Sequence, residues 1–278
     1  MRALRTALLA ALALALASAP ATAGDGTPPP GTKPPAGRMN FVGCPVIRDT
    51  AEVPCWLAEY QGELYYIGIQ NDITATFHPP QLKHRALVEG MVSKKPRICG
   101  GIVLEPVNVS VIPEVDTRCN KILPAQGYRI DNAPRGTGPA SRGMQAASDP
   151  NPPPPAPPPP PPAPPFAPRD VAVRFGFDGL YMNFHNFKIV QDTAAYVRAS
   201  GARKIRIEGH RGATLLSNGR TLVETAGLAR QRADKVAEAL RGLGVAPASL
   251  EVAASEVIET PDGVADFERR RVRIVVTP

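Results

Sequence analysis

The chain has 278 residues, of which 33 are proline, and it carries a formal net charge of +7 with a pI near 9.4. The length suits about two ordinary domains, but most of the prolines lie in two tracts, which leaves less chain for folding than the length suggests. The positive charge is mild and spread out, and no Lys/Arg block with interleaved aromatic residues occurs, so we expect no nucleic-acid partner.

Residues 1–23 have the pattern of a secretory signal peptide. A basic start (1–5) is followed by a short apolar run rich in Leu and Ala (6–19) and by a small-residue cleavage site (21–23). The apolar run is short for a membrane span, and no run of 18 apolar residues follows, so we expect no transmembrane segment in the mature chain. We expect cleavage near Ala23 and export to the periplasm or to an outer-membrane-associated state; an uncleaved N-terminal anchor is the alternative.

The next segments predict a proline-rich tether and a small all-β domain. Residues 24–37 cannot build a core, whereas residues 38–135 contain short β-rich segments separated by turn residues. The expected strands lie at 39–42, on both sides of a hairpin turn (60–63) within 55–69, and at 86–92, 98–104 and 107–112. Five or six such strands suit a small closed barrel. The strand at 87–92, with Gly90 where a barrel strand must bend, resembles a strand of the OB-fold.

All four cysteines, Cys44, Cys55, Cys99 and Cys119, lie in this first domain. An even number of cysteines in an exported protein favours two disulfides. Three connectivities are possible, and we prefer Cys44–Cys55 with Cys99–Cys119 because each pair closes a short loop. A zinc site is the alternative, but the spacing contains no C-x-x-C pair. We therefore expect disulfides, no metal and no other cofactor.

Aromatic residues are concentrated in the same domain, at Trp56, Tyr60, Tyr65 and Tyr66. Barrel cores use such residues, so we expect them in the core, with a ligand platform as the alternative. The sequence names no ligand for this domain; an envelope protein partner is the hypothesis for residues 38–135.

Residues 136–168 are predicted to be a disordered, proline-rich linker. The segment from Pro150 to Pro168 is nearly pure proline, which favours an extended polyproline II rod of about 3.1 Å per residue. We expect this rod to separate two domains and to let each engage its own target.

Residues 169–278 predict a second, α+β domain. Alternating or apolar segments at 171–177, 204–208, 250–258 and 272–276 indicate strands, and helical periodicity occurs at 189–199 and 221–243. The resulting order, β-α-β-α-β-β, implies a mixed sheet covered by helices on one face, an α+β sandwich. Arg269 to Arg271 are expected to form a half-exposed strand end, and His210 to cap another.

Five short motifs in this domain follow a known order. They are Phe175-Gly-Phe-Asp178 (F-x-F-D), Ile205 to His210 (I-x-V-x-G-H), Leu228 to Leu240 (L-S-x-x-R-A-x-x-V-x-x-x-L), Leu243-Gly-Val245, and Arg270-Arg-Val272 (R-R-V). Residues 170–278 thereby resemble the C-terminal peptidoglycan-binding domain of the OmpA family, a family of bacterial envelope proteins.

The resemblance implies a binding site for the diaminopimelate residue of the peptidoglycan stem peptide. In the family, an arginine binds its carboxylate and an aspartate binds its ammonium group, as charge and geometry favour. Arg232 stands at the arginine position, but Gly212 stands where the aspartate is expected, and Arg211 adds a positive charge. The loop from there to Leu228 is longer than in the family, and its only carboxylate, Glu224, is the candidate substitute. The peptidoglycan-binding residues are thus predicted to be Arg232, Gly212 and Glu224.

The sequence contains no nucleophile elbow, no metal-spaced histidine cluster and no phosphate loop, so we expect no enzyme. It predicts an exported, non-enzymatic cell-envelope protein that associates with peptidoglycan through its OmpA-like domain. The alternative is an envelope protein-interaction module whose OmpA-like domain has lost diaminopimelate binding, as Gly212 indicates.

Overall fold

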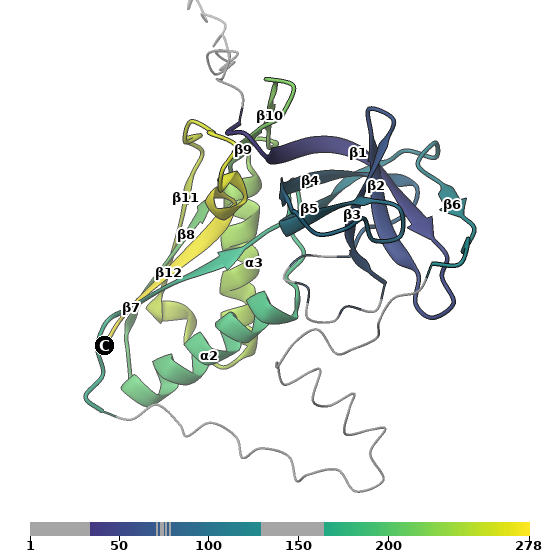
Figure 1. Cartoon of the computed structure of the whole chain (residues 1–278). Helices are drawn as coiled ribbons and strands as arrows, with labels where there is room; N and C mark the ends of the chain where they lie inside the picture. The colour runs from purple at the N-terminus through teal and green to yellow at the C-terminus, as the bar shows by residue number, and fades with distance from the viewer. Residues whose placement is uncertain (1–33, 71, 73–74, 76, 78, 129–163) are drawn as a thin grey trace, which may run out of the picture.

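The computed structural model describes residues 34–278 except 71, 73–74, 76, 78 and 129–163. The predicted signal peptide, most of the tether, and the linker up to residue 163 lie outside the described residues. Those described form an all-β domain and an α+β domain that lie side by side (Figure 1). Within these ranges, none of the helices is long and apolar enough to cross a membrane.

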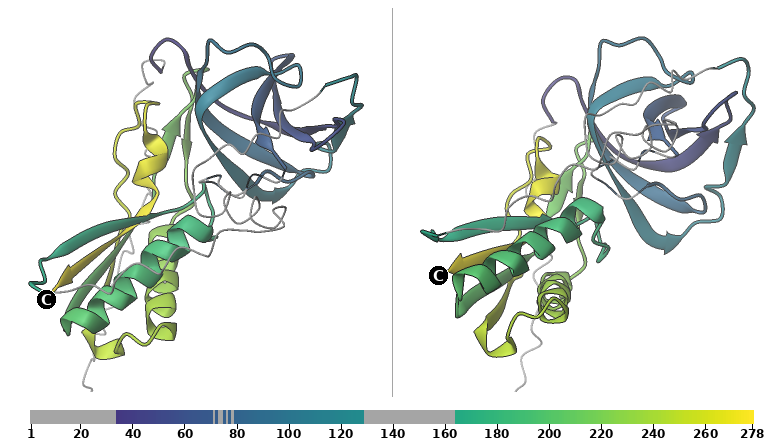
Figure 2. Two further views of the ribbon diagram at one scale, coloured as in Figure 1. Left: turned by 60° about the horizontal axis from the view of Figure 1, so that its bottom comes forward. Right: turned by 90° about the horizontal axis from the view of Figure 1, so that it is seen from below.

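The first domain is a closed five-stranded barrel with one added strand, as the strand pattern predicts. Strand β1 pairs with β2, β2 with β3, β3 with β5, β5 with β4, and β4 again with β1, while β6 adds to the end of β1. Figure 2 shows these strands curving around a common centre. The bounds are β1 Arg38–Arg48, β2 Cys55–Tyr60, β3 Glu63–Ile69, β4 His84–Val92, β5 Ile102–Val115 and β6 Lys121–Leu123.

The predicted break at Glu105-Pro106 is wrong, because β5 runs through both residues as one strand. Pro106 has no N–H to donate, yet a bulge accommodates it: the register of β4 against β5 shifts between Gly90 and Val92, opposite the proline. A Cβ on Gly90 would lie 3.1 Å from the carbonyl oxygen of Pro106. The glycine expected at the bend of the barrel strand therefore lies where a neighbouring backbone approaches closely.

The aromatic residues form core, as predicted. Trp56, Tyr65 and Tyr66 are each at most 8% exposed. The ring of Tyr60, which is partly buried, stacks on Phe41 with 4.6 Å between centroids. Trp56, Tyr60 and Tyr65 therefore pack in one apolar cluster of this domain and Tyr66 in another, and they do not form an exposed ligand platform.

Two disulfides are present, but the predicted pairing is wrong: Cys44 bonds to Cys119 and Cys55 to Cys99. The reason is the strand register, because Cys44 lies opposite Glu59 in β2, whereas Cys55 lies opposite Arg48. Cys44 and Cys55 are therefore offset by four residues along the strands, roughly 13 Å, which is beyond disulfide reach. Since all four sulfurs form disulfides, the zinc alternative for the cysteines is also wrong.

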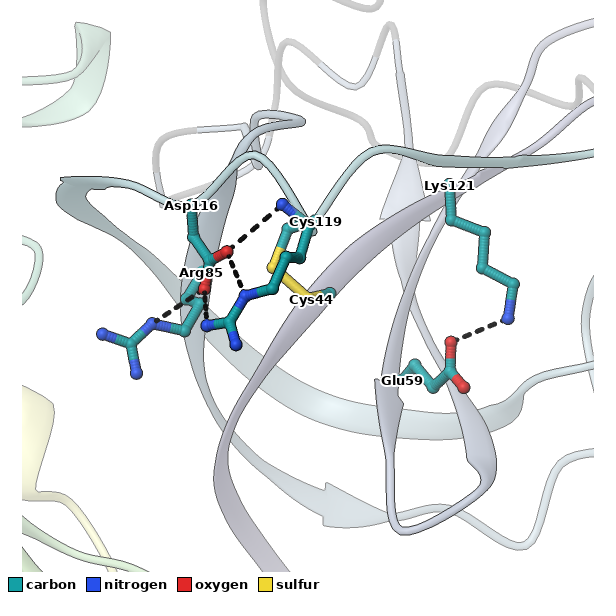
Figure 3. Close-up of a disulfide and its surroundings, with 7 residues drawn as sticks. Cys44, Glu59, Arg85, Asp116, Cys119 and Lys121 are labelled. Atoms are coloured by element: carbon teal, nitrogen blue, oxygen red, sulfur yellow. Dashed lines mark hydrogen bonds and ion pairs between the residues drawn. A yellow bond between two sulfur atoms is a disulfide. The ribbon is translucent and has the colours of Figure 1, made fainter.

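Charged residues fix the loop that carries Cys119 (Figure 3). Asp116 accepts hydrogen bonds from the side chain of Arg118, at 2.8 Å from Nε, and forms an ion pair with Arg85 of β4 at 3.8 Å. The hydrogen bond from Arg118 lowers the pKa of Asp116 to about 2. On the other side of the disulfide, Lys121 pairs with Glu59 at 2.8 Å. The disulfide and these charges together join β6 and its loop to the barrel.

We expect the double substitution Cys44→Ala/Cys119→Ala to lower the free energy of unfolding by about 2–5 kcal/mol. The bond joins residues 75 positions apart, so its removal releases a long loop in the unfolded chain. Urea unfolding of the purified protein measures the loss. Peptide mapping without reduction tests the pairing itself, and a peptide linking Cys44 to Cys55 would contradict the structure.

The second domain is a four-stranded sheet with two helices on one face, in the strand order β11-β8-β12-β7 (Figure 1). The predicted β-α-β-α-β-β order is present, with an additional hairpin, β9–β10, after β8. The bounds are β7 Arg169–Arg174, α2 Phe184–Ser200, β8 Lys204–His210, β9 Ala213–Leu215, β10 Thr221–Val223, α3 Leu228–Gly242, η1 Pro247–Ser249, β11 Leu250–Ser255, η2 Asp266–Arg269 and β12 Arg271–Thr277.

The helix predicted at 221–243 begins only at Leu228. Thr221 to Val223 instead pair with β9, a partner that local periodicity cannot reveal, and Gly227 at the start of α3 has a φ of 83°. The helix then packs closely on β8: a Cβ on Gly209 would lie 1.9 Å from the carbonyl oxygen of Ala229. The glycine of the G-H motif therefore permits this contact between helix and strand.

The two domains pack directly against each other, contrary to the expectation that a rod separates them. Val42 and Leu87 of the barrel share an apolar cluster with side chains of the second domain, namely Phe177, Leu216 and Leu222. The buried side-chain amide of Asn40 in β1 donates to the carbonyl oxygens of Leu215 (3.0 Å) and Gly263 (2.9 Å). Much of this contact comes from the β9–β10 hairpin, so the additional length of that loop joins the domains.

Candidate functional site

Arg232 extends from the buried face of α3 into the protein interior, and its side chain is 0% exposed. Its Nε donates to the carbonyl oxygen of Gly179 (3.1 Å), Nη1 to that of His210 (3.2 Å), and Nη2 to that of Gly176 (2.8 Å). The remaining Nη1 and Nη2 hydrogens bind the two carboxylate oxygens of Glu224 at 2.8 and 2.5 Å. A guanidinium has five N–H donors, so every donor of Arg232 is used within the chain.

Glu224 follows β10 directly, and its side chain is also 0% exposed. Besides the two bonds from Arg232, its carboxylate accepts the backbone N–H of Asp178 at 2.9 Å and that of Gly212 at 2.7 Å. An ionised carboxylate accepts about four hydrogen bonds. Both partners of the buried pair are thus fully satisfied, which is the condition under which a buried ion pair is tolerated.

The hairpin brings the predicted site residues together. Ala213 pairs with Val223 in the hairpin. One residue further along each strand, Glu224 donates its backbone N–H to the carbonyl of Gly212 at 3.1 Å. Glu224 is therefore held at the open end of the hairpin, with its carboxylate directed at Arg232. All three predicted residues, Arg232, Gly212 and Glu224, lie in one solvent-excluded cluster.

Neighbouring charges hold this cluster closed. Arg211, whose side chain is 17% exposed, donates to the carbonyl of Glu224 at 2.6 Å and pairs with Glu256 at 2.7 Å. Asp178 accepts the backbone N–H of Thr225 at 2.7 Å, and burial raises the pKa of Asp178. The positive charge that the sequence adds at Arg211 is therefore neutralised internally and fixes the loop around Glu224.

The position of the missing aspartate, Gly212, does not face Arg232. A Cβ on Gly212 would lie 3.0 Å from Cγ of Arg270 and 3.5 Å from Cβ of Arg269. Its backbone N–H donates to the Glu224 carboxylate, and its carbonyl accepts the backbone N–H of Glu224. A side chain here would therefore compete for space with the stem of Arg270.

We expect Gly212→Asp to lower the free energy of unfolding by about 1–3 kcal/mol, because it overpacks a buried position. It should not create binding of diaminopimelate, since the new carboxylate would be directed away from Arg232. Thermal unfolding and calorimetric titration with meso-diaminopimelate measure the two effects. A stable variant that binds the amino acid would contradict this geometry.

The arginines near the C-terminus differ from the expected half-exposed strand end, because Arg270 is 0% exposed. It donates to Thr214 of β9 at 2.8 Å and forms a bidentate pair with Glu89 of β4, which is 4% exposed. Thr214 also donates to Glu89 at 2.9 Å. Burial opposes the charge of Arg270, but the surrounding carboxylates, Glu89 foremost, together outweigh this effect and raise its pKa.

The Arg270–Glu89 contact joins the two domains and was missed by the sequence prediction. The available signal was Glu89 itself, an acidic residue within the apolar run from Leu87 to Val92 of a strand expected to be buried. A carboxylate at such a position requires a cationic partner.

His210 adds little to either cluster beyond its carbonyl, and burial lowers the pKa of its ring. In the parts of the chain that the structure describes, no group of His, Cys, Asp and Glu is suited to hold a metal ion.

The element order and the motif positions define the second domain as an OmpA-like α+β sandwich in which the motif arginine pairs with a glutamate of the same chain. The chain is similar to the OmpA-like domain of FopA1 from Francisella tularensis subsp. tularensis SCHU S4, with 16% identity over 39% of this chain and 71% of that chain, at a TM-score of 0.30.

Two further solved structures are similar over the same share of the chain. The peptidoglycan-associated lipoprotein from Burkholderia pseudomallei is 25% identical over 38% of this chain and 89% of that chain, with a TM-score of 0.31. The periplasmic domain of Helicobacter pylori MotB is 18% identical over 39% and 78%, with a TM-score of 0.29. No protein-family profile matches the chain, and neither does any curated protein sequence.

Proposed function

We propose that this protein is an exported, non-enzymatic cell-envelope protein whose OmpA-like domain does not bind diaminopimelate through Arg232. In this proposal the domain instead forms one binding unit with the barrel. The observation that carries the proposal is that all five N–H donors of Arg232 are used within the chain, at 0% exposure. A ligand carboxylate has no free donor to bind there.

The Glu224 carboxylate takes the place that the family resemblance gives to the carboxylate of the ligand. To bind Arg232, diaminopimelate would have to displace Glu224 and leave a buried carboxylate without its partner. Breaking a buried pair in this way costs about 3–5 kcal/mol, which weakens apparent binding by roughly a factor of 10² or more. The position of the family's aspartate offers no compensation, because Gly212 contributes only a backbone N–H, and Glu224 already accepts it.

The assignment to the envelope rests on the signal-like residues 1–23 and on the OmpA-like motifs. Of the similar structures, the peptidoglycan-associated lipoprotein carries wall association in its name. Association with peptidoglycan is the second candidate function for this chain, through a surface that does not involve Arg232. The observation that favours it is an exposed aromatic group at the start of α2, where Tyr181 is 56%, Phe184 70% and Phe187 37% exposed.

Sedimentation with purified peptidoglycan separates these candidates. The full mature chain is mixed with sacculi with and without an excess of meso-diaminopimelate, alongside Phe184→Ser and the solvent-exposed control Val257→Ser. We expect that an excess of meso-diaminopimelate does not reduce the amount of wild-type chain that sediments with the sacculi. Sedimentation that resists meso-diaminopimelate but is lost in Phe184→Ser would support the aromatic surface, whereas competition by meso-diaminopimelate would overturn the proposal for Arg232.

A further inference from the structure

A cavity of about 240 Å³ lies between the two domains. Residues 108–111 of β5 form the barrel side, and Phe175, Phe177 and Ile189 belong to the opposite side, with the exposed Tyr181 at the margin. Neither Arg232 nor Glu224 lines it, although Gly176 and Gly179, whose carbonyls accept hydrogen bonds from Arg232, do. Both domains are needed to form its walls.

The barrel wall of this cavity contains a polar atom without a partner. Ser110 is 1% exposed, and its hydroxyl forms no hydrogen bond in the part of the chain that the structure describes. It faces Gly176 of the second domain, since a Cβ on that glycine would lie 3.5 Å from the Ser110 oxygen. Buried hydroxyl groups are normally satisfied, so this one marks a position where a ligand atom can hydrogen-bond.

Other polar groups around the cavity are used within the protein. The side-chain amide of Asn108 donates to Glu89 at 3.4 Å, and the side-chain oxygen of Asn186 accepts the backbone N–H of Arg174 at 3.1 Å. Arg174 also lines the cavity, and its charge is paired at 3.5 Å with Glu268, which is not part of the lining. The walls therefore favour a neutral ligand, because burying a charge beside them would be unfavourable.

The size and walls of the cavity restrict the ligand further. A cavity of about 150 Å³ holds benzene, so the larger volume here suits a group of about two fused rings. A sugar would bring several hydroxyl groups that need partners, whereas Ser110 offers a single unused hydroxyl. Apolar pockets with few polar groups commonly lie at domain interfaces and bind small molecules.

We propose that the cavity between β5 and the β7–α2 region is a binding site for a neutral, mainly apolar group of about two rings that hydrogen-bonds to Ser110. The site belongs to neither domain alone and exists only while the barrel and the OmpA-like domain are docked. It does not depend on whether Arg232 binds diaminopimelate.

The test uses 2-naphthol and naphthalene as matched probes with and without a hydroxyl group, titrated into the full chain. We expect one saturable site that prefers 2-naphthol. Ser110→Ala should reduce this preference about five- to tenfold, whereas the control Ser249→Ala, at a residue that does not line the cavity, should not change it. Gly176→Val should abolish binding of both probes, because its side chain fills the space beside Ser110.

Thermal unfolding checks that each variant is folded, and Val111→Phe, at a partly exposed position in the lining, serves as a second filling variant. Absence of saturable binding in the wild-type chain would overturn the proposal. So would an unchanged preference in Ser110→Ala, or binding that both filling variants retain. N-acetylglucosamine is titrated as well, and if it binds where the naphthyl probes do not, a sugar site replaces the apolar site proposed here.

Discussion

Replacing Glu89 by alanine should lower the free energy of unfolding by about 3–5 kcal/mol. The substitution leaves Arg270, which is 0% exposed, without its carboxylate at the contact between the domains. The guanidinium has little to replace it, because its Nε has no hydrogen-bond partner among the described residues and Thr214 supplies only a hydroxyl. Urea unfolding, followed by the fluorescence of the single tryptophan, Trp56, measures the effect.

The exposed pair of Arg273 with Asp170 is the matched control, because both side chains are 50% exposed. Exposed ion pairs contribute at most about 1 kcal/mol, so Asp170→Ala should change stability little. We also expect Glu89→Ala to make the contact between the domains accessible to proteases before the barrel unfolds. If Glu89→Ala and Asp170→Ala cost the same, the buried pair does not hold the domains together.

Glu224→Ala should be similarly destabilising, by about 3–5 kcal/mol, because it leaves Arg232 charged and buried with no carboxylate. The substitution also removes the acceptor for the backbone N–H groups of Asp178 and Gly212. Asp234→Ala, on the same helix as Arg232, is the control, since Asp234 forms an exposed pair with Arg230, and it should cost at most a few tenths of a kcal/mol.

A double-mutant cycle isolates the pair itself. Arg232→Ala and Glu224→Ala should each be strongly destabilising, whereas the combined substitution should cost less than their sum, since neither charge is then left alone. The vacated space in Glu224→Ala should also accept a free carboxylate, so added acetate should raise its melting temperature more than that of the wild type. Additive costs and no effect of acetate would show that the two residues do not depend on each other.

Local patterns in the sequence predict much of the second domain, because its helices and strands have strong periodicity and its motifs keep their order. Residues 221–227 are the exception. Their partner is β9, and only that pairing makes Thr221 to Val223 a strand and directs Glu224 inwards. Glu224, the only carboxylate of the longer loop, was predicted to substitute for the family's aspartate in ligand binding, whereas the structure pairs it with Arg232. The closure also depends on backbone groups from two other segments, 176–179 and 210–212.

Contacts between distant segments explain the remaining errors. The disulfide pairing depends on the register of β1 against β2, which places Cys44 opposite Glu59, and sequence separation carries no information on that register. The burial of Arg270 depends on Glu89, 181 residues earlier in the chain. The proline-rich linker suggested separate domains by its composition, but composition does not reveal the complementary surfaces of Asn40 and the β9–β10 hairpin.

Calorimetric titration of meso-diaminopimelate into the full wild-type chain tests most directly whether Glu224 closes the arginine site. Because every N–H donor of Arg232 is already used, we predict no saturable binding to the wild type and measurable binding to Glu224→Ala under conditions where that variant is folded. Saturable one-to-one binding to the wild type that is lost in Arg232→Lys would contradict the closed site.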